Sequence, residues 1–250
     1  MFLNRVVKMK VIQLTDLHLF SDIHQELFGV NTYNSFNKII NHLLLKEGDC
    51  DAIIVTGDIS QDETVPSYEL ALELLKKLNK PVYYLQGNHD QKEKLNLVFS
   101  DLKPIDELCS PYWNFISVDT VDYGKDSGFL SNDELNNLKN KICKNERNNI
   151  ALIMHHHCLK LGTPLIDGCM LLNSNKLIEI IDKEKTIKLV ICGHAHGDYK
   201  LTHKNFTLEV APAVCFQWKK GTKLPDVEKK IGYRKFYFFK DKYLSETIMI

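Results

Sequence analysis

Carboxylate, amide and imidazole side chains follow five separate apolar runs of this 250-residue sequence. The runs end in the segments TDLH, TGD, GNHD, MHHH and GHAH. These three kinds of side chain supply oxygen and nitrogen ligands to metal ions in proteins. The candidate ligands are Asp16, His18, Asp58, Asn88, His155, His194 and His196.

The spacing of these residues allows them to reach a common cavity. Asp16 and His18 lie two residues apart, as do His194 and His196, and side chains two apart in extended chain point to the same side. Glycine, which permits a sharp turn and a close backbone approach, directly precedes three candidates, at Gly57, Gly87 and Gly193. The pattern therefore indicates one shared site.

Seven ligands are too many for one transition-metal ion, but they suit two ions that share a bridging carboxylate. Two ions about 3.5–4 Å apart are typical of phosphoesterase chemistry. Imidazole and carboxylate ligands favour Mn, Fe or Zn over Ca or Mg. Each segment alone has a simpler interpretation, since GNHD suits a turn and HHH suits a core or surface cluster. The five segments together favour a metal site.

Buried strands are the elements that must position these residues. The apolar runs are four to six residues long and rich in Val, Ile, Leu and Tyr, as expected of strands covered on both faces. In open α/β sheets, ligands bind at the carboxyl ends of the strands. The predicted strands lie within residues 10–16, 51–58, 81–90, 114–119, 149–157 and 188–196.

Amphipathic helices are predicted between several of these strands. Ser131 and Glu134 form a capping-box signature at the start of one helix. Two further strands, NFTLEVAP and YRKFYFFK, follow near the end with no helix predicted between them. This order predicts a layered α/β fold, and we expect residues 1–250 to form a single domain. The predicted helices span residues 31–46, 65–78, 131–142 and 173–185.

Composition argues against several partners. Lys plus Arg equals Asp plus Glu at 32 each, so no excess positive charge favours nucleic acid or an anionic membrane. No apolar stretch approaches the roughly 18 residues of a membrane span, and the first residues do not resemble a signal peptide. The seven cysteines are odd in number and lack a CxxC pair, which favours free thiols in a reducing cytoplasm.

The ordered segments DLH, GD, GNHD, H and GHAH resemble the signature of the calcineurin-like metallophosphoesterases. This resemblance covers residues 16–196 and implies a four-layer α/β/β/α sandwich with metal ions at the strand ends. The chain looks most similar to the bacterial class III 3′,5′-cyclic AMP phosphodiesterases, through LFGVNTYNSF, TGDISQD, LLNSNKL and PAVCFQWK. Gln86 and Cys158 depart from that pattern, which has proline at both positions, and are expected to reshape the pocket wall.

The resemblance also implies roles for individual residues. One ion would bind Asp16, His18, Asp58 and His196, and the other would bind Asp58, Asn88, His155 and His194. A hydroxide that bridges the ions would attack phosphorus, and His89 would protonate the leaving oxygen. Asp90 is expected either to orient His89 or to serve as a turn residue. The residues expected to contact substrate are His18, Asp58, Asn88, His89 and His196.

The HHH triplet cannot place all three side chains in one site. By the family pattern the first, His155, is the metal ligand. Strand alternation would turn His156 away into a structural position and let His157 line the rim, where it is a candidate for substrate contact. The sequence marks no aromatic pair for stacking against a base.

The predicted function is hydrolysis of 3′,5′-cyclic AMP, a small-molecule substrate, to 5′-AMP. The alternative is a broader phosphoesterase that acts on 2′,3′-cyclic nucleotides, other diesters or monoesters. A non-catalytic scaffold is also conceivable, but the complete ligand set and the presence of His89 argue against it. The sequence leaves the native metals and the oligomeric state open.

Overall fold

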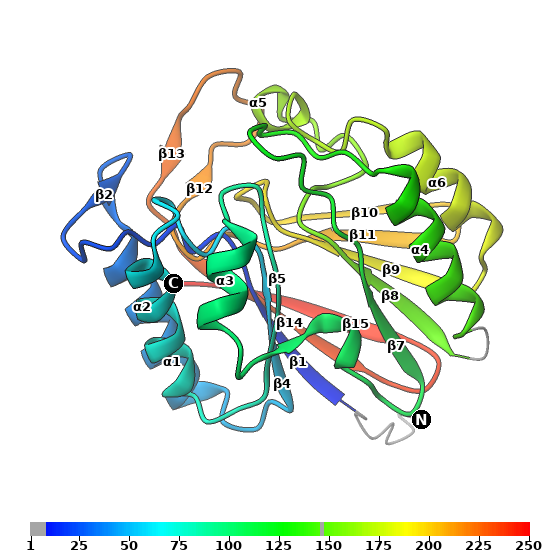
Figure 1. The fold of residues 1–250 in the computed structure, drawn as a ribbon, viewed down its shortest axis with the longest axis horizontal. Helices are drawn as coiled ribbons and strands as arrows, with labels where there is room; N and C mark the ends of the chain where they lie inside the picture. Colours follow the sequence, from blue (N-terminus) through cyan, green and yellow to red (C-terminus); the bar gives the residue numbers. More distant parts are fainter. Residues whose placement is uncertain (1–8, 146–147) are drawn as a thin grey trace, which may run out of the picture.

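Two β-sheets lie face to face and helices cover the outer face of each (Figure 1). The structure is a computed structural model that describes residues 9–145 and 148–250. The prediction that the chain lacks a signal peptide therefore falls partly on residues 1–8, which lie outside the described residues.

The first sheet has six strands in the order β15-β14-β1-β4-β5-β6. Strands β1, β4, β5 and β6 are parallel, whereas β14 and β15 add antiparallel strands beside β1. The carboxyl ends of β1, β4 and β5 therefore meet at one edge of this sheet. The bounds are β1 Met9–Leu14, β4 Ala52–Thr56, β5 Val82–Leu85, β6 Lys103–Pro104, β14 Gly232–Phe238 and β15 Tyr243–Met249.

The second sheet has five strands in the order β10-β11-β9-β8-β7. All are parallel except β10, which pairs antiparallel with β11. Two short hairpins, β2–β3 and β12–β13, stand apart from the sheets. The bounds are β2 Glu26–Leu27, β3 Val30–Asn31, β7 Trp113–Ser117, β8 Asn149–Ile153, β9 Ile187–Cys192, β10 Tyr199–His203, β11 Phe206–Val210, β12 Gln217–Trp218 and β13 Val227–Glu228.

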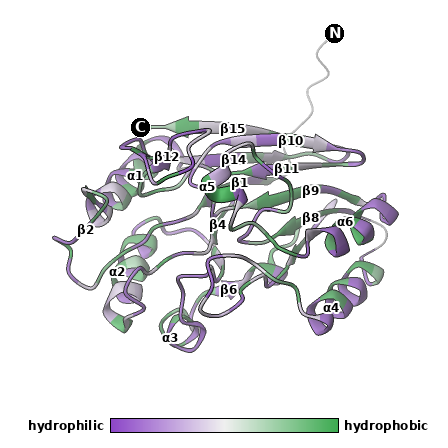
Figure 2. Ribbon diagram, turned by 90° about the horizontal axis from the view of Figure 1, so that it is seen from above, coloured by the Kyte–Doolittle hydropathy of each residue, from purple (hydrophilic) through white to green (hydrophobic). Residues whose placement is uncertain are grey.

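The helices fall into two groups. Figure 2 shows α1, α2 and α3 beside the first sheet and α4 and α6 beside the second. Within the described part of the chain, no helix is both long enough and apolar enough to cross a membrane. The bounds are α1 Thr32–Lys46, α2 Val65–Lys76, α3 Lys92–Val98, α4 Asn132–Cys143, α5 Pro164–Asp167 and α6 Ser174–Lys183, with a single 3₁₀ turn at Ile105–Glu107.

Side-chain alternation along the strands builds three cores between the four layers. In β1, Ile12 and Leu14 pack with the α1–α3 helices, whereas Val11 packs in the space between the sheets. The second sheet packs against α4 and α6 in a core of its own, which includes Leu152 and Leu177. Because strands in this arrangement are buried on both faces, their sequences are almost continuously apolar. The predicted four-layer α/β/β/α sandwich is confirmed.

The predicted strands and helices are found, with boundaries shifted by a few residues at most helix ends. Ser131 caps α4 by accepting from the Glu134 backbone N–H (3.0 Å), as the capping signature predicts. The Glu134 carboxylate, however, accepts from the Asp119 backbone N–H (3.1 Å) and so ties α4 to the segment after β7. Helix α3 and strands β10 and β15 were not predicted, because their apolar patterns are short or alternate with exposed polar residues.

Candidate metal centre and substrate pocket

All seven predicted ligands converge where strands β1, β4, β5, β8 and β9 end. Asp16, His18, Asp58, His155, His194 and His196 are buried, and Asn88 is half-buried. Because both sheets contribute, the site lies where their carboxyl edges come together. Groups of His and Asp side chains here have potential ligand atoms within 4.8 Å of one another.

Five of the seven residues have a left-handed backbone. Their φ angles lie between 40° and 66°, a region that non-glycine residues rarely adopt. Such strain persists where the surrounding structure determines the conformation, and it is concentrated at functional sites. The i, i+2 pairs therefore reach one cavity from tight turns rather than from extended chain, which corrects the predicted local geometry. The five are Asp16, His18, Asp58, His194 and His196.

Asp58 occupies the centre of the cluster. Its Oδ2 lies 3.2 Å from His155 Nε2 and 3.5 Å from His18 Nε2, and its Oδ1 accepts from the His89 backbone N–H (2.9 Å). Burial alone would raise the pKa of this carboxyl, but the adjacent His155 holds it well below its usual range. A permanently charged carboxylate between two imidazoles is suited to bridging two cations.

The rings of His18 and His196 bring two nitrogen lone pairs together. His18 Nδ1 lies 2.7 Å from Gln61 Oε1, and His196 Nδ1 lies 3.2 Å from the Phe216 carbonyl oxygen. Both partners are acceptors, so both Nδ1 atoms carry the proton and both Nε2 atoms are bare. The two Nε2 atoms are only 3.0 Å apart. Lone pairs at this distance repel, and a cation coordinated by both would remove the repulsion.

His155 directs its Nε2 to the Asp58 carboxylate. Its Nδ1 donates to the Thr56 carbonyl (2.8 Å), which directs Nε2 into the site. Burial would lower the pKa of His155, but Asp58, whose Oδ2 lies 3.2 Å from this Nε2, raises it to about 9. Burial and the nearby Asp58 charge raise the pKa of Asp16 to about 7, although His155 opposes the shift. Imidazole nitrogens beside buried carboxylates fit the predicted cations, and the predicted division of ligands stays a prediction.

The three consecutive histidines have different surroundings. His156 is buried, with Nδ1 2.8 Å from Thr120 Oγ1 and Nε2 3.2 Å from the Asp126 carbonyl, which suits the structural position expected for it. His157 is fully buried, so the prediction that it lines the rim is wrong. The chain turns sharply after β8, and His157 packs behind His194, its Nε2 3.7 Å from Asp167 Oδ1.

Asp90 holds two loops together. Its carboxylate accepts from the backbone N–H groups of Ile59, Ser60 and Gly87 at 2.8–3.3 Å. Its hydrogen bonds in the described structure do not extend to the His89 ring, which corrects the idea that Asp90 orients His89. The carboxylate instead fixes the turns that carry Asp58 and Asn88.

Gln61 is a site residue that the sequence analysis did not single out. Its Oε1 faces His18 Nδ1, and its Nε2 lies 3.4 Å from His89 Nδ1. With Oε1 towards His18, the amide N–H group of Gln61 points to His89.

Substitutions at Gln61 are expected to separate its two contacts. Gln61→Ala removes both, and we expect metal affinity or turnover to fall about 10- to 100-fold, as for other residues that orient metal ligands. Gln61→Glu keeps an acceptor for His18 but loses the donor to His89, so turnover should fall more than metal affinity. Metal titration and steady-state kinetics measure both quantities, and unchanged values for Gln61→Ala would contradict the assignment.

Gly87 allows the GNHD loop to approach Asp58. A Cβ atom at this position would lie 2.1 Å from Asp58 Oδ1 and 2.4 Å from the Asp58 backbone nitrogen. We therefore expect Gly87→Ala to lower the free energy of unfolding by about 1–3 kcal/mol and to displace the site. Urea unfolding of the variant and the wild type measures this change in the free energy of unfolding. Gly48→Ala is the control, because a Cβ there meets no atom within 4 Å; equal effects would refute the steric reason.

A pocket of about 630 Å³ opens onto the candidate metal centre. The rings of Phe28, Phe216 and Trp218 line one part of the pocket. His89 and Gln61 also line the pocket. No local sequence pattern predicts this aromatic group, because Phe28 lies about 190 residues from the other two rings. The volume is within the range of small-molecule sites.

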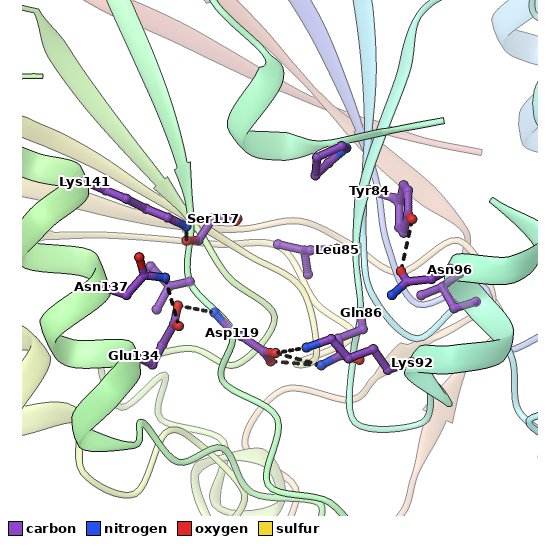
Figure 3. A pocket seen from close by; sticks show the side chains of 13 residues that line it. Tyr84, Leu85, Gln86, Lys92, Asn96, Ser117, Asp119, Glu134, Asn137 and Lys141 are labelled. Carbon is purple, nitrogen blue, oxygen red and sulfur yellow. Dashed lines mark hydrogen bonds and ion pairs between the residues drawn. The ribbon is translucent and has the colours of Figure 1, made fainter. Parts of the chain in front are cut away.

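Gln86 lines a second cavity of about 270 Å³ rather than this pocket (Figure 3). Its Nε2 donates to the Asp119 carboxylate (2.9 and 3.0 Å), which also pairs with Lys92. Cys158 is buried in the core beside the second sheet. Neither departure from the proline pattern reshapes the metal-site pocket as was expected, because both side chains point elsewhere.

Comparison with known proteins decides the family. The sequence profile of the calcineurin-like phosphoesterases matches residues 9–198, about three-quarters of the chain. This chain belongs to that family. As a calcineurin-like phosphoesterase it is a hydrolase, and the family's two-metal centre corresponds to the observed convergence of His and Asp side chains.

Two bacterial relatives cover most of this phosphoesterase. A probable cyclic nucleotide phosphodiesterase from Xenorhabdus bovienii is 36% identical over 96% of this chain and 100% of its own length. A 3′,5′-cyclic adenosine monophosphate phosphodiesterase from Haemophilus influenzae is 32% identical over 84% of this chain and 78% of its own.

Solved structures show the same fold. A dimetal phosphatase from Danio rerio has a TM-score of 0.69 at 10% identity, covering 98% of this chain and 99% of its own. A purple acid phosphatase from yellow lupin has a TM-score of 0.65 at 12% identity, covering 96% of this chain and 51% of its own. At these identities the likeness supports the fold alone.

Proposed function

We propose that this phosphoesterase hydrolyses 3′,5′-cyclic AMP to 5′-AMP. The observation that carries the proposal is the convergence of imidazole nitrogens and buried carboxylates at the floor of the 630 Å³ pocket. The substrate class is supported by the names of the two bacterial relatives, which are cyclic nucleotide phosphodiesterases.

The seven predicted ligands would hold two ions, which we propose to be Mn, Fe or Zn. Asp16, His18 and His196 would hold one ion together with Asp58, and the other three ligands would hold the second ion together with it. When bound, such ions offset the charge of the phosphate and lower the pKa of water towards neutrality. The other three are Asn88, His155 and His194.

His89 would supply the proton that the leaving group needs. Hydrolysis breaks the bond between phosphorus and the ribose 3′ oxygen, and an alkoxide is a poor leaving group unless it is protonated. The His89 ring lines the pocket 5.1 Å from the His18 ring, between centroids. Its backbone N–H donates to Asp58 Oδ1 (2.9 Å), and its Nδ1 lies 3.4 Å from Gln61 Nε2.

We also propose a cytoplasmic location. All seven cysteines are free thiols, a state that a reducing compartment maintains. Cyclic nucleotides would be small-molecule substrates there. The expectations of no nucleic-acid partner and no membrane association stay predictions from the charge balance.

Steady-state hydrolysis by the Mn²⁺-loaded protein tests the substrate. The comparison uses 3′,5′-cyclic AMP, 2′,3′-cyclic AMP, 5′-AMP and bis(p-nitrophenyl) phosphate, with 5′-AMP measured as product. We expect the highest kcat/KM for 3′,5′-cyclic AMP. If that ester is nearly inert while the others turn over, the cyclic AMP assignment is wrong and the broader phosphoesterase function takes its place.

A further inference from the structure

Phe28 has an unfavourable backbone and an exposed ring. It is the first of two residues in the tight turn between β2 and β3, and both turn residues have positive φ, 49° for Phe28 and 70° for Gly29. Such turns favour Asn, Asp or Gly, and a bulky residue there is an outlier. Phe28 is nevertheless 50% exposed, so its own burial does not explain why phenylalanine is present.

The turn is held in place above the pocket. Lys229 Nζ donates to the Gly29 carbonyl (2.7 Å), and this contact ties the hairpin to the segment after β13. The Phe28 ring meets Trp218 edge to face, with centroids 5.2 Å apart and planes at 77°. Both rings border the same pocket as His89 and His196.

The buried ring of Phe216 packs against both rings of this corner. It contacts Phe28 and Trp218 nearly at right angles, with centroids 5.7 and 5.1 Å away. Trp218 in turn lies 5.6 Å from His196, with the two planes only 34° apart. A flat ring that rests in the Phe28–Trp218 corner therefore lies beside the candidate metal centre.

We propose that Phe28 and Trp218 form a platform that binds the purine base of the nucleotide substrate. The choice of a purine base rests on the proposed function, whereas the arrangement of the two rings is observed in the structure. A planar base would stack on one ring, contact the edge of the other and cover apolar surface that is now exposed, while its phosphate reaches the metal ligands. Aromatic stacking of this kind tolerates different bases, so the platform would favour nucleotides over small esters.

Binding of two phosphates that differ only by the base tests the platform without relying on catalysis. Isothermal titration of the Mn²⁺-loaded full-length protein with 5′-AMP and with ribose 5-phosphate gives the contribution of the base. We expect the wild type to bind 5′-AMP roughly tenfold or more tightly than ribose 5-phosphate. Phe28→Ala should lower this ratio of affinities roughly tenfold. Phe129→Ala is the control, because Phe129 is 44% exposed and does not line this pocket.

A second variant separates ligand binding from folding. Asparagine accepts a left-handed backbone, so Phe28→Asn should keep or raise the melting temperature while it lowers the 5′-AMP to ribose 5-phosphate ratio. A lower melting temperature with an unchanged ratio would mean that Phe28 only packs the hairpin, and would overturn the platform.

The outcomes also distinguish this proposal from the proposed function. If 3′,5′-cyclic AMP is inert but Phe28→Ala abolishes the preference for 5′-AMP, the platform stands and the reaction is wrong. If 3′,5′-cyclic AMP is hydrolysed but the wild type binds both phosphates equally, or Phe28→Ala keeps the preference, the platform is wrong and the reaction stands.

Discussion

Replacement of Asp58 by asparagine is expected to lower kcat/KM at least about a thousandfold and to weaken metal binding. The amide has nearly the shape of the carboxylate but lacks its charge. Asp58 Oδ2 lies 3.2 Å from His155 Nε2 and 3.5 Å from His18 Nε2, so the substitution removes the negative charge that faces both rings.

Metal-dependent stabilisation provides a readout of Asp58 besides activity. A ligand that binds only the folded state raises the melting temperature, so added Mn²⁺ should stabilise the wild type more than Asp58→Asn. The control is Asp101→Asn, which removes an exposed carboxylate paired with Lys76. A variant that retains the full Mn²⁺ shift would show that Asp58 is not a shared ligand.

The sequence was sufficient to predict the site residues that directly follow the strands. Buried parallel strands are apolar along their whole length, so the polar residues that follow them, such as Asp16 and Asp58, mark one edge of a sheet. The two sheets then bring His155 and His194 to the same place, because their parallel strands end at the same edge. These placements depend on topology, which the alternation of strands and helices predicts.

Residues from loops could not be predicted in the same way. Gln61 reaches both His18 and His89 only because the strained turn after β4 directs it there. Asp90 follows His89 in sequence, yet its carboxylate points to backbone N–H groups of another loop. Side-chain direction in such turns depends on backbone angles that single-residue preferences do not specify.

Replacement of His89 by alanine is expected to lower turnover of 3′,5′-cyclic AMP by about 10²–10⁴-fold while metal binding is retained. The side chain borders the pocket next to Asn88 and is held by Gln61, so it is placed to give a proton to the leaving oxygen. Its backbone N–H, which contacts Asp58, remains in the variant, and the metal centre should therefore survive.

The leaving group decides whether His89 acts as an acid or only shapes the pocket. A p-nitrophenolate ion leaves without protonation, so His89→Ala should turn over bis(p-nitrophenyl) phosphate at close to the wild-type rate. A general loss of positioning would slow both esters alike, and that result would contradict the acid role. His203→Gln, a change on β10 outside the pocket, is the matched histidine control. In His89→Ala, the turnover of 3′,5′-cyclic AMP relative to that of bis(p-nitrophenyl) phosphate therefore shows whether this imidazole protonates the leaving oxygen.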